Sequence, residues 1–387
     1  KENPFKGISA FALVMLESRG KLDIDQPVSK YWPAFAAHGK ENVTVRELVD
    51  HAVGLAGVDP PFTLEMCADK LKTRDHAAMA KMEWPNPGDR KGYMAVNLGF
   101  YESALVQLTE GSGRERTIGE YLREEAFEPL GIADEIFIGT ADSVPDFRRA
   151  TIDGMQLFEP LWPTGAYPDG FMKRLLLEQS SYTARAFRNP QLSAMPGVCD
   201  YNKKEVQRVE IPASNGLASA RGLATMYRAA ERAINTDGAE NPLGLTRGAL
   251  AKFQQDPQPG RENGWMDEVI GIEVCMGAGL LLPPPKELRG SGRFCGCPSG
   301  FGTPGAGGSF AYCDHDHEVA YAYVMNRCGQ LICDDPREFA LRHKMYETVA
   351  KIRKKEGGTP VQMDNLNKPH YLSQRYIEEY PELKPLP

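Results

Sequence analysis

The sequence predicts an α+β protein, and two observations about the order of its elements lead to that class. First, the segments with helical periodicity fall mainly before about residue 235. Second, after about residue 265 the apolar runs become short, and one of them reads as a hairpin that turns at "DHDH", residues 314–317. Helices that come before antiparallel strands favour a helical subdomain packed beside a sheet.

The first predicted element is a helix over residues 8–18 that ends at Gly20. Its apolar residues recur at helical spacing: Ile8, Phe11, Ala12, Met15 and Leu16. The next helix starts in "TVRELVDHAVGL", where Thr44 and Glu47 have the spacing of a capping box. Further helices are expected around residues 65–82, 97–109, 117–126 and 215–234, with an irregular stretch rich in Pro, Gly and aromatic residues over 140–210.

The later part of the chain is expected to supply the strands. They are predicted in "EVIGIEVCMGAGLLL" (268–282), in the hairpin "GGSFAYCDHDHEVAYAYVMNR" (307–327) and in "LICD" (331–334). A long helix follows over 336–355, and residues 356–387 form a tail rich in Pro and Tyr.

Composition excludes several classes of function. The net charge of −7 is spread along the 387 residues, with no basic stripe, so nucleic acid is not expected as a partner. The apolar runs are too short to span a bilayer. The eight cysteines match no disulfide framework, and "CGC" at 295–297 lacks a second pair at zinc-finger spacing, so neither a metal nor a cofactor is expected. The sequence names no cellular compartment.

Several separated segments together resemble the superfamily of serine β-lactamases and penicillin-binding proteins, most closely its class C-related branch of esterases and β-lactamase-like proteins. The resemblance implies a sheet flanked by helices and packed on a helical subdomain. The segments occur in family order and cover nearly all of the chain but the tail: "KGISAFALVMLESRGKLDIDQPVSKYWPAF", "VTVRELVDHAVGL", "PGDRKGYMAVNLG", "EIPASNGLASARGLATMY" and "FGTPGAGGSFAYCDHDHEVAYAYVMNR".

The resemblance implies a particular chemistry. A serine hydroxyl is a poor nucleophile until a neighbouring base removes its proton, and Ser-x-x-Lys places both groups on one helix face. Lys6 matches that lysine, Tyr93 matches the family's proton-handling tyrosine, and Gly305 matches a glycine on the opposite strand. The backbone N–H groups of Asn3 and Ala306 occupy the positions that stabilise the oxyanion.

Two side chains of the family pattern are missing. The nucleophile position holds Asn3, and the strand position usually occupied by His or Lys holds Thr303. An amide cannot serve as the nucleophile, so the resemblance predicts a catalytically inactive relative with a binding or assembly role. The alternative is an active hydrolase of esters, peptides or lactams that uses another nucleophile. These residues also have a purely structural interpretation, in which Asn3 is an ordinary helix N-cap, Lys6 is a solvated lysine at a helix start and Tyr93 is a packing residue.

Three other sets of residues could in principle supply a nucleophile or a metal site. Ser9 lies three residues after Lys6 but a turn deeper, away from the expected oxyanion donors. Cys67 precedes Lys70 at the same spacing with a thiol, where a surface helix is the better interpretation. His315 and His317 could bind a metal, but a solvated hairpin turn is favoured.

The ends of the chain complete the prediction. Family members have two strands before the nucleophile helix, whereas this sequence starts almost at that helix. We therefore expect residues 1–44 and 251–355 to form a sheet-containing subdomain without those strands, and residues 45–250 a mainly helical one. Residues 356–387 form a C-terminal extension whose tyrosines could anchor a second copy or a protein partner, while the cleft could hold a small acyl or peptide-like ligand. The three tyrosines are Tyr371, Tyr376 and Tyr380.

Overall fold

The fold was examined in a computed structural model of the 387-residue chain. The structure describes residues 5–140, 142, 144–154, 167–195, 198–236, 241–255, 257–283, 300–305, 307–329, 331, 335–363 and 378. In this part of the chain, no helix is both long and apolar enough to cross a membrane.

The longest helices are α1 (Phe5–Ser18), α6 (Leu98–Thr109), α12 (Ala220–Asn235) and α14 (Pro336–Glu356). Shorter helices lie between them: α2 (Val28–Tyr31), α3 (Val45–Val49), α4 (Leu64–Cys67), α5 (Lys70–Ala78), α7 (Ile118–Leu122), α9 (Phe171–Leu176), α10 (Tyr182–Phe187), α11 (Lys204–Arg208) and α13 (Arg247–Phe253). A π-helix over Arg123–Phe127 continues α7.

The main sheet has five antiparallel strands in the order β5-β6-β7-β8-β9. They are β5 (Met276–Gly277), β6 (Leu280–Leu281), β7 (Phe301–Gly305), β8 (Ser309–Asp314) and β9 (Val319–Tyr323). Two small antiparallel pairs lie apart from it: β1 (Ile136–Phe137) with β4 (Leu217–Ala218), and β2 (Ala194–Met195) with β3 (Val198–Cys199).

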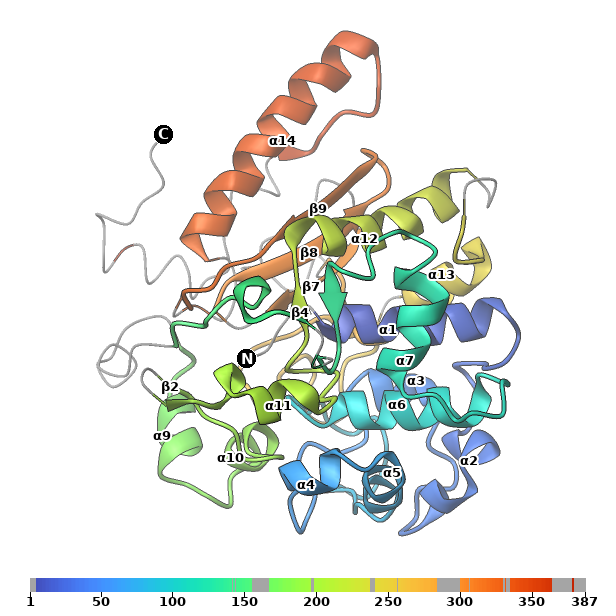
Figure 1. Ribbon diagram of the computed structural model, residues 1–387. Helices are drawn as coiled ribbons and strands as arrows, with labels where there is room; N and C mark the ends of the chain where they lie inside the picture. Colours follow the sequence, from blue (N-terminus) through green and yellow to red (C-terminus); the bar gives the residue numbers. More distant parts are fainter. Residues whose placement is uncertain are drawn as a thin grey trace.

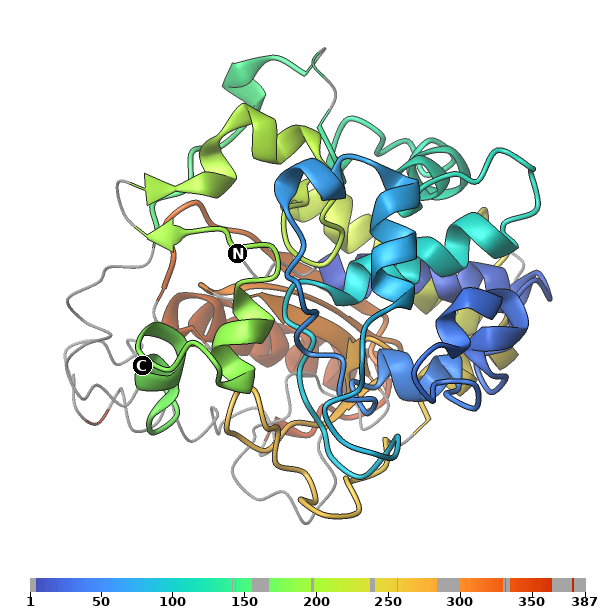
Figure 2. The same ribbon diagram turned by 90° about the horizontal axis from the view of Figure 1, so that it is seen from below.

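The sheet lies between two layers of helices (Figure 1). Side chains alternate along a strand, so β8 turns Phe310 and Tyr312 to one face and Ala311 and Cys313 to the other. The first pair packs on Tyr346 of α14, and the second joins the large core that contains α1 and α12. Seen from below, the blue and cyan helices of residues 64–109 lie on the side of the molecule away from α14 (Figure 2).

Most predicted elements are confirmed, and three differ in an instructive way. The helix expected over 65–82 is two helices, because the Asp69 side chain accepts hydrogen bonds from the N–H groups of Leu71 and Lys72 and so starts a new helix. The strand expected over 268–282 is two short strands, because Ala278 and Gly279 adopt positive φ angles of 51° and 76° and form a turn. The helix expected over 8–18 begins earlier, at Phe5, and every residue from Phe5 to Leu16 is buried.

Of the other predictions, two are confirmed and two are not tested by the described residues. The capping box at Thr44 and Glu47 is present, and the terminal helix is α14. The strand expected over 331–334 falls largely outside the described residues. The division into subdomains stays a prediction, although α12 lies within the range 45–250 and packs on β8 and β9.

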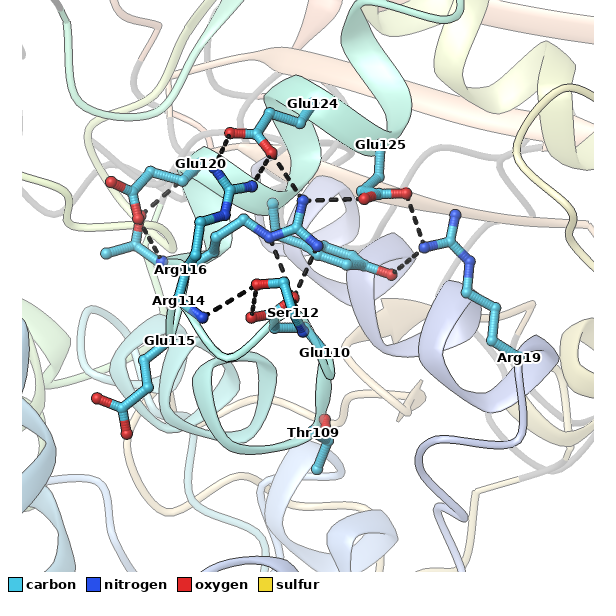
Figure 3. A network of polar contacts seen from close by, with 12 residues as sticks. Arg19, Thr109, Glu110, Ser112, Arg114, Glu115, Arg116, Glu120, Glu124 and Glu125 are labelled. Atoms are coloured by element: carbon cyan, nitrogen blue, oxygen red, sulfur yellow. Dashed lines mark hydrogen bonds and ion pairs between the residues drawn. The ribbon is translucent and has the colours of Figure 1, made fainter.

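A buried ionic network ties the end of α6 to α7 and the π-helix (Figure 3). Its centre is Arg116, whose side chain is 7% exposed and lies 2.7 Å from Glu110, which is 1% exposed. Arg116 also reaches Glu124 at 2.8 Å and Glu125 at 2.9 Å. Burial alone would raise the pKa of Glu110, but hydrogen bonds from Ser112 and Arg116 lower it to about 2. The carboxylate is therefore ionised in the folded protein throughout the physiological range.

Replacing Arg116 by Met should lower the free energy of unfolding by about 3 kcal/mol at pH 7, because it leaves the Glu110 carboxylate buried without its main partner. The matched control is Arg114→Met in the same network, where the arginine side chain is 59% exposed and the loss should stay below about 1 kcal/mol. Urea unfolding of both variants measures the difference. Equal losses would show that the buried pair contributes no more than an exposed one.

Candidate active site

Lys6 lies in the first turn of α1 and is almost completely buried. Its Nζ donates to the carbonyl oxygen of Ala95 at 2.5 Å and to that of Ala213 at 3.4 Å. The same nitrogen lies 4.6 Å from the centroid of the Tyr93 ring, within reach of a cation–π interaction. The structure thus brings together Lys6 and Tyr93, two residues 87 positions apart in sequence. Lys6 also links α1 to two separate segments of the helical part.

Tyr93 is held against a buried histidine that sequence reasoning missed. The rings of His51 and Tyr93 have centroids 5.0 Å apart, and the backbone N–H of Met94 donates to His51 Nδ1 at 3.0 Å. An Nδ1 that accepts a hydrogen bond places the proton of a neutral imidazole on Nε2. Burial, together with the charges of Lys6 and Lys91, lowers the pKa of His51 well below its usual 6.5, so the ring is neutral at pH 7.

Thr303, on β7, lies beside Gly7 of α1. Its side chain is buried, and its Oγ1 accepts a hydrogen bond of 3.3 Å from the hydroxyl of Tyr227 on α12. A Cβ atom placed on Gly7 would come within 2.2 Å of both of these oxygens, so only glycine fits next to Lys6 at this crossing. Thr303 is therefore near Lys6 in space, but its hydroxyl is engaged in packing α1 against the sheet.

Two further site residues cannot be placed. Asn3 and Ala306, the predicted donors of the oxyanion site, lie outside the described residues. Gly305 ends β7 and pairs with Ser309 of β8. The turn between them contains Gly307 and Gly308 at φ angles of 89° and 105°, which favour glycine. The roles given to Asn3, Thr303, Gly305 and Ala306 remain predictions.

A buried carboxyl group lies close to the lysine. Glu102 of α6 is fully buried, and within the described residues neither of its carboxylate oxygens has a hydrogen-bond partner. A Cβ atom on Gly279 would lie 3.4 Å from Glu102 Oε1 and 4.0 Å from the backbone oxygen of Lys6, which places the carboxyl group beside α1. Burial raises the pKa of Glu102 to about 8, and the positive charge of Lys6 only partly opposes this. The group is mostly protonated at pH 7.

The substitute nucleophiles are poorly suited to catalysis. Ser9 is completely buried, and its hydroxyl has no hydrogen-bond partner among the described residues. Burial raises the pKa of the Cys67 thiol to about 12, so it carries almost no thiolate. The amine of Lys70 donates to the carbonyl oxygen of Glu115 at 2.7 Å. Within the part of the chain that the structure describes, no base is therefore hydrogen-bonded to the Ser9 hydroxyl, and the Cys67 thiol stays protonated.

The interpretation of His317 as part of a solvated turn was wrong. Its side chain is only 2% exposed and is hydrogen-bonded to Asp314 inside the hairpin, because α14 covers this end of the sheet. The hairpin itself is confirmed, with its turn between β8 and β9. Among the residues that the structure describes, no three His, Cys, Asp or Glu side chains are grouped as a metal site requires.

Comparison with known proteins places this site in a family context. The family model described as Beta-lactamase matches residues 5–338. The chain is 29% identical to the Esterase/beta-lactamase LipL of Mycobacterium tuberculosis over 367 residues, which covers 92% of this chain and 76% of that protein.

The solved structures that share the fold at 25% identity or more include the following two. EstA from Arthrobacter nitroguajacolicus Rue61a superposes with a TM-score of 0.72 at 25% identity, covering 90% of this chain and 84% of that one. A penicillin-binding protein homologue from Caulobacter crescentus gives 0.67 at 28%, covering 87% and 80%. These likenesses confirm the β-lactamase and transpeptidase-like fold that the sequence motifs predict. Because the family model matches most of the chain, this protein belongs to the beta-lactamase family.

Proposed function

We propose that this protein is a non-catalytic member of the beta-lactamase family that acts by binding or assembly. The observation that carries the proposal is Asn3, three positions before Lys6, where the sequence resemblance leads us to expect the family's nucleophilic serine. A carboxamide does not form an acyl-enzyme under physiological conditions. The neighbouring hydroxyl and thiol, Ser9 and Cys67, are both buried, which supports the loss of turnover.

The contacts of Lys6 support a structural role for the remaining lysine. A lysine that acts as a general base must lose its proton, but carbonyl oxygens and the face of an aromatic ring all favour the ammonium form. Lys6 faces two carbonyl oxygens and the Tyr93 ring. It therefore fastens α1 to residues 93–95 and 213 whether or not any chemistry takes place.

The binding role has two candidate places. One is the cleft that the family resemblance predicts beside Tyr93, which would take a small acyl or peptide-like ligand. The other is the extension over residues 356–387, which would contact a protein partner or a second copy of the chain. Val361 and Met363, at the beginning of this extension, pack against the sheet of their own domain, so the contact with a partner would involve residues beyond them.

The second candidate function is an active hydrolase of the esterase type. It is favoured by the name of one relative, since LipL is called an esterase and β-lactamase. The preserved pair of Lys6 and Tyr93 points the same way, because these two residues match the family's proton-handling groups.

Covalent labelling distinguishes the two functions. The purified chain is incubated with a fluorophosphonate and, separately, with a penicillin, and its intact mass is measured. We expect no adduct, because no activated nucleophile is present at position 3. A stoichiometric adduct on folded protein would establish the hydrolase instead, and peptide mapping would identify the nucleophile.

A further inference from the structure

A further cluster of buried ionisable groups lies at the turn of the β8–β9 hairpin, where α14 packs on it. His317 Nδ1 lies 2.9 Å from Asp314 Oδ1 and 3.0 Å from Asp314 Oδ2. His317 Nε2 lies 3.4 Å from the carbonyl oxygen of Pro360, which belongs to the segment that follows α14. One imidazole ring therefore connects the hairpin to the beginning of the C-terminal extension.

The charged and titratable groups around the ring come from three elements. Within the hairpin, the backbone N–H of His317 donates to Asp314 Oδ1 at 3.2 Å, and His315 lies 3.3 Å from Asp316. From α14, the hydroxyl of Tyr346 donates to Asp314 Oδ2 at 2.6 Å. Also from α14, Arg353 donates to the carbonyl oxygen of His317 at 2.7 Å and lies 3.5 Å from Glu318. From the described residues after α14, the carbonyl oxygen of Pro360 faces the ring.

Both ring nitrogens face acceptors, and this fixes the charge state that satisfies them. A carboxylate and a backbone carbonyl both need an N–H group, whereas a neutral imidazole has only one. The ring can donate to Asp314 and Pro360 together only as the imidazolium. Burial opposes this charge, but the hydrogen bond and the negative charge of Asp314 outweigh it and raise the pKa of His317 above its usual 6.5.

Loss of the ring proton has a local consequence. The remaining N–H stays with the carboxylate, and the bare Nε2 then faces the lone pairs of the Pro360 carbonyl oxygen. Residues 358–363 keep their apolar contacts, which Val361 and Met363 make with the cluster around Tyr346, but they lose this polar one. Segments held by few contacts open at low free energy, so one hydrogen bond to a charged group matters here.

We propose that His317 is a pH-sensitive clasp that, in its charged form, fastens residues 358–363 and thereby the start of the C-terminal extension to the β8–β9 hairpin. A histidine with a raised pKa in the folded state stabilises its contacts fully below the pKa of the unfolded chain. That contribution is lost as the pH rises through the folded-state value. The clasp is therefore closed under mildly acidic conditions and opens on the alkaline side. It does not depend on whether the protein is catalytic.

Amide hydrogen exchange of the full-length chain, read by mass spectrometry on peptides covering residues 357–363, tests the clasp. After correction for the intrinsic pH dependence of exchange, protection should fall about tenfold between pH 6 and pH 9, the effect of one hydrogen bond to a charged group. His317→Gln should show the low protection at every pH. The matched control is His38→Asn, an exposed histidine at a positive φ that asparagine tolerates, and it should behave like the unmodified chain.

Asp314→Asn separates a titrating clasp from a merely structural one. Removing the carboxylate charge should move the midpoint of the protection change to lower pH, because the imidazolium loses its counter-charge. A midpoint that does not move would overturn the proposal. The unmodified chain supplies a test that needs no variant, since protection of residues 357–363 that is constant from pH 6 to pH 9 would overturn it as well.

Discussion

Replacing Asn3 by Ser should give the protein a reactive nucleophile. The substitution restores Ser-x-x-Lys with the preserved Lys6, whose side chain lies against Tyr93. Removing the nucleophile of a serine hydrolase costs about six orders of magnitude in rate. We expect a smaller gain, on the order of 10³-fold in the rate of fluorophosphonate labelling, because the contacts of Lys6 favour its charged form and so oppose its action as a base.

The controls for this gain use the same position and the same lysine. Asn3→Ala should label no faster than the unmodified chain, and Asn3→Ser combined with Lys6→Met should lose the gain. Circular dichroism checks that each variant is folded, which matters because Lys6 also connects α1 to Ala95 and Ala213. If folded Asn3→Ser forms no adduct at all, a serine at position 3 is not sufficient for a reactive nucleophile. The next substitution to add would then be Thr303→His.

The part of the site that the sequence could predict is the part carried by local motifs. Lys6 and Tyr93 lie in separate motifs whose family order implies that the two residues are close. In the structure, Lys6 Nζ lies 4.6 Å from the centroid of the Tyr93 ring. The same holds for the capping box of Thr44 and for the hairpin at residues 314–317, because caps and turns are determined by neighbouring residues.

The residues that sequence reasoning missed depend on contacts between distant segments. Glu102 stands in a helix among apolar residues and has the appearance of an ordinary polar helix position. Only the packing of α6 against α1 and Gly279 buries it. His51 follows a short helix, and its importance comes from the backbone of Met94, 43 residues later. His317 was assigned to solvent because nothing in "DHDH" reveals that a helix starting at residue 336 will cover it.

Three buried ionisable groups lie near one another, Lys6, His51 and Glu102, and Glu102 differs from the other two in its charge state. His51 is neutral and Lys6 donates to carbonyl oxygens, so each is in the charge state that its surroundings favour. Glu102 differs, because it would be charged in water at pH 7 but is mostly protonated in the fold. A buried carboxyl group of this kind lowers stability whenever the unfolded chain would ionise it.

Replacing Glu102 by Gln should therefore stabilise the protein at alkaline pH. The pKa of the carboxyl rises from its ordinary 4.5 to about 8 on folding, so between these values the folded state holds a proton that the unfolded state releases. Stability falls with rising pH over that window, and it does not change from this group below or above it. Glutamine has the same shape and never ionises, so the variant should be more stable by about 4 kcal/mol at pH 8 and nearly equal at pH 4.5.

Urea unfolding of both proteins across this pH range measures the effect as a difference. Contributions from other titrating groups, such as Glu110, cancel because they are common to both chains. Glu205→Gln is the matched control: this glutamate is exposed on α11, and its replacement should leave stability within about 0.5 kcal/mol at every pH.

A difference in stability between Glu102→Gln and the unmodified chain that is independent of pH would show that the Glu102 carboxyl is not held protonated. In that case Lys6, whose positive charge favours the ionised carboxyl, would be its stabilising partner, and the lysine would be retained for that charge pair instead of for its backbone contacts.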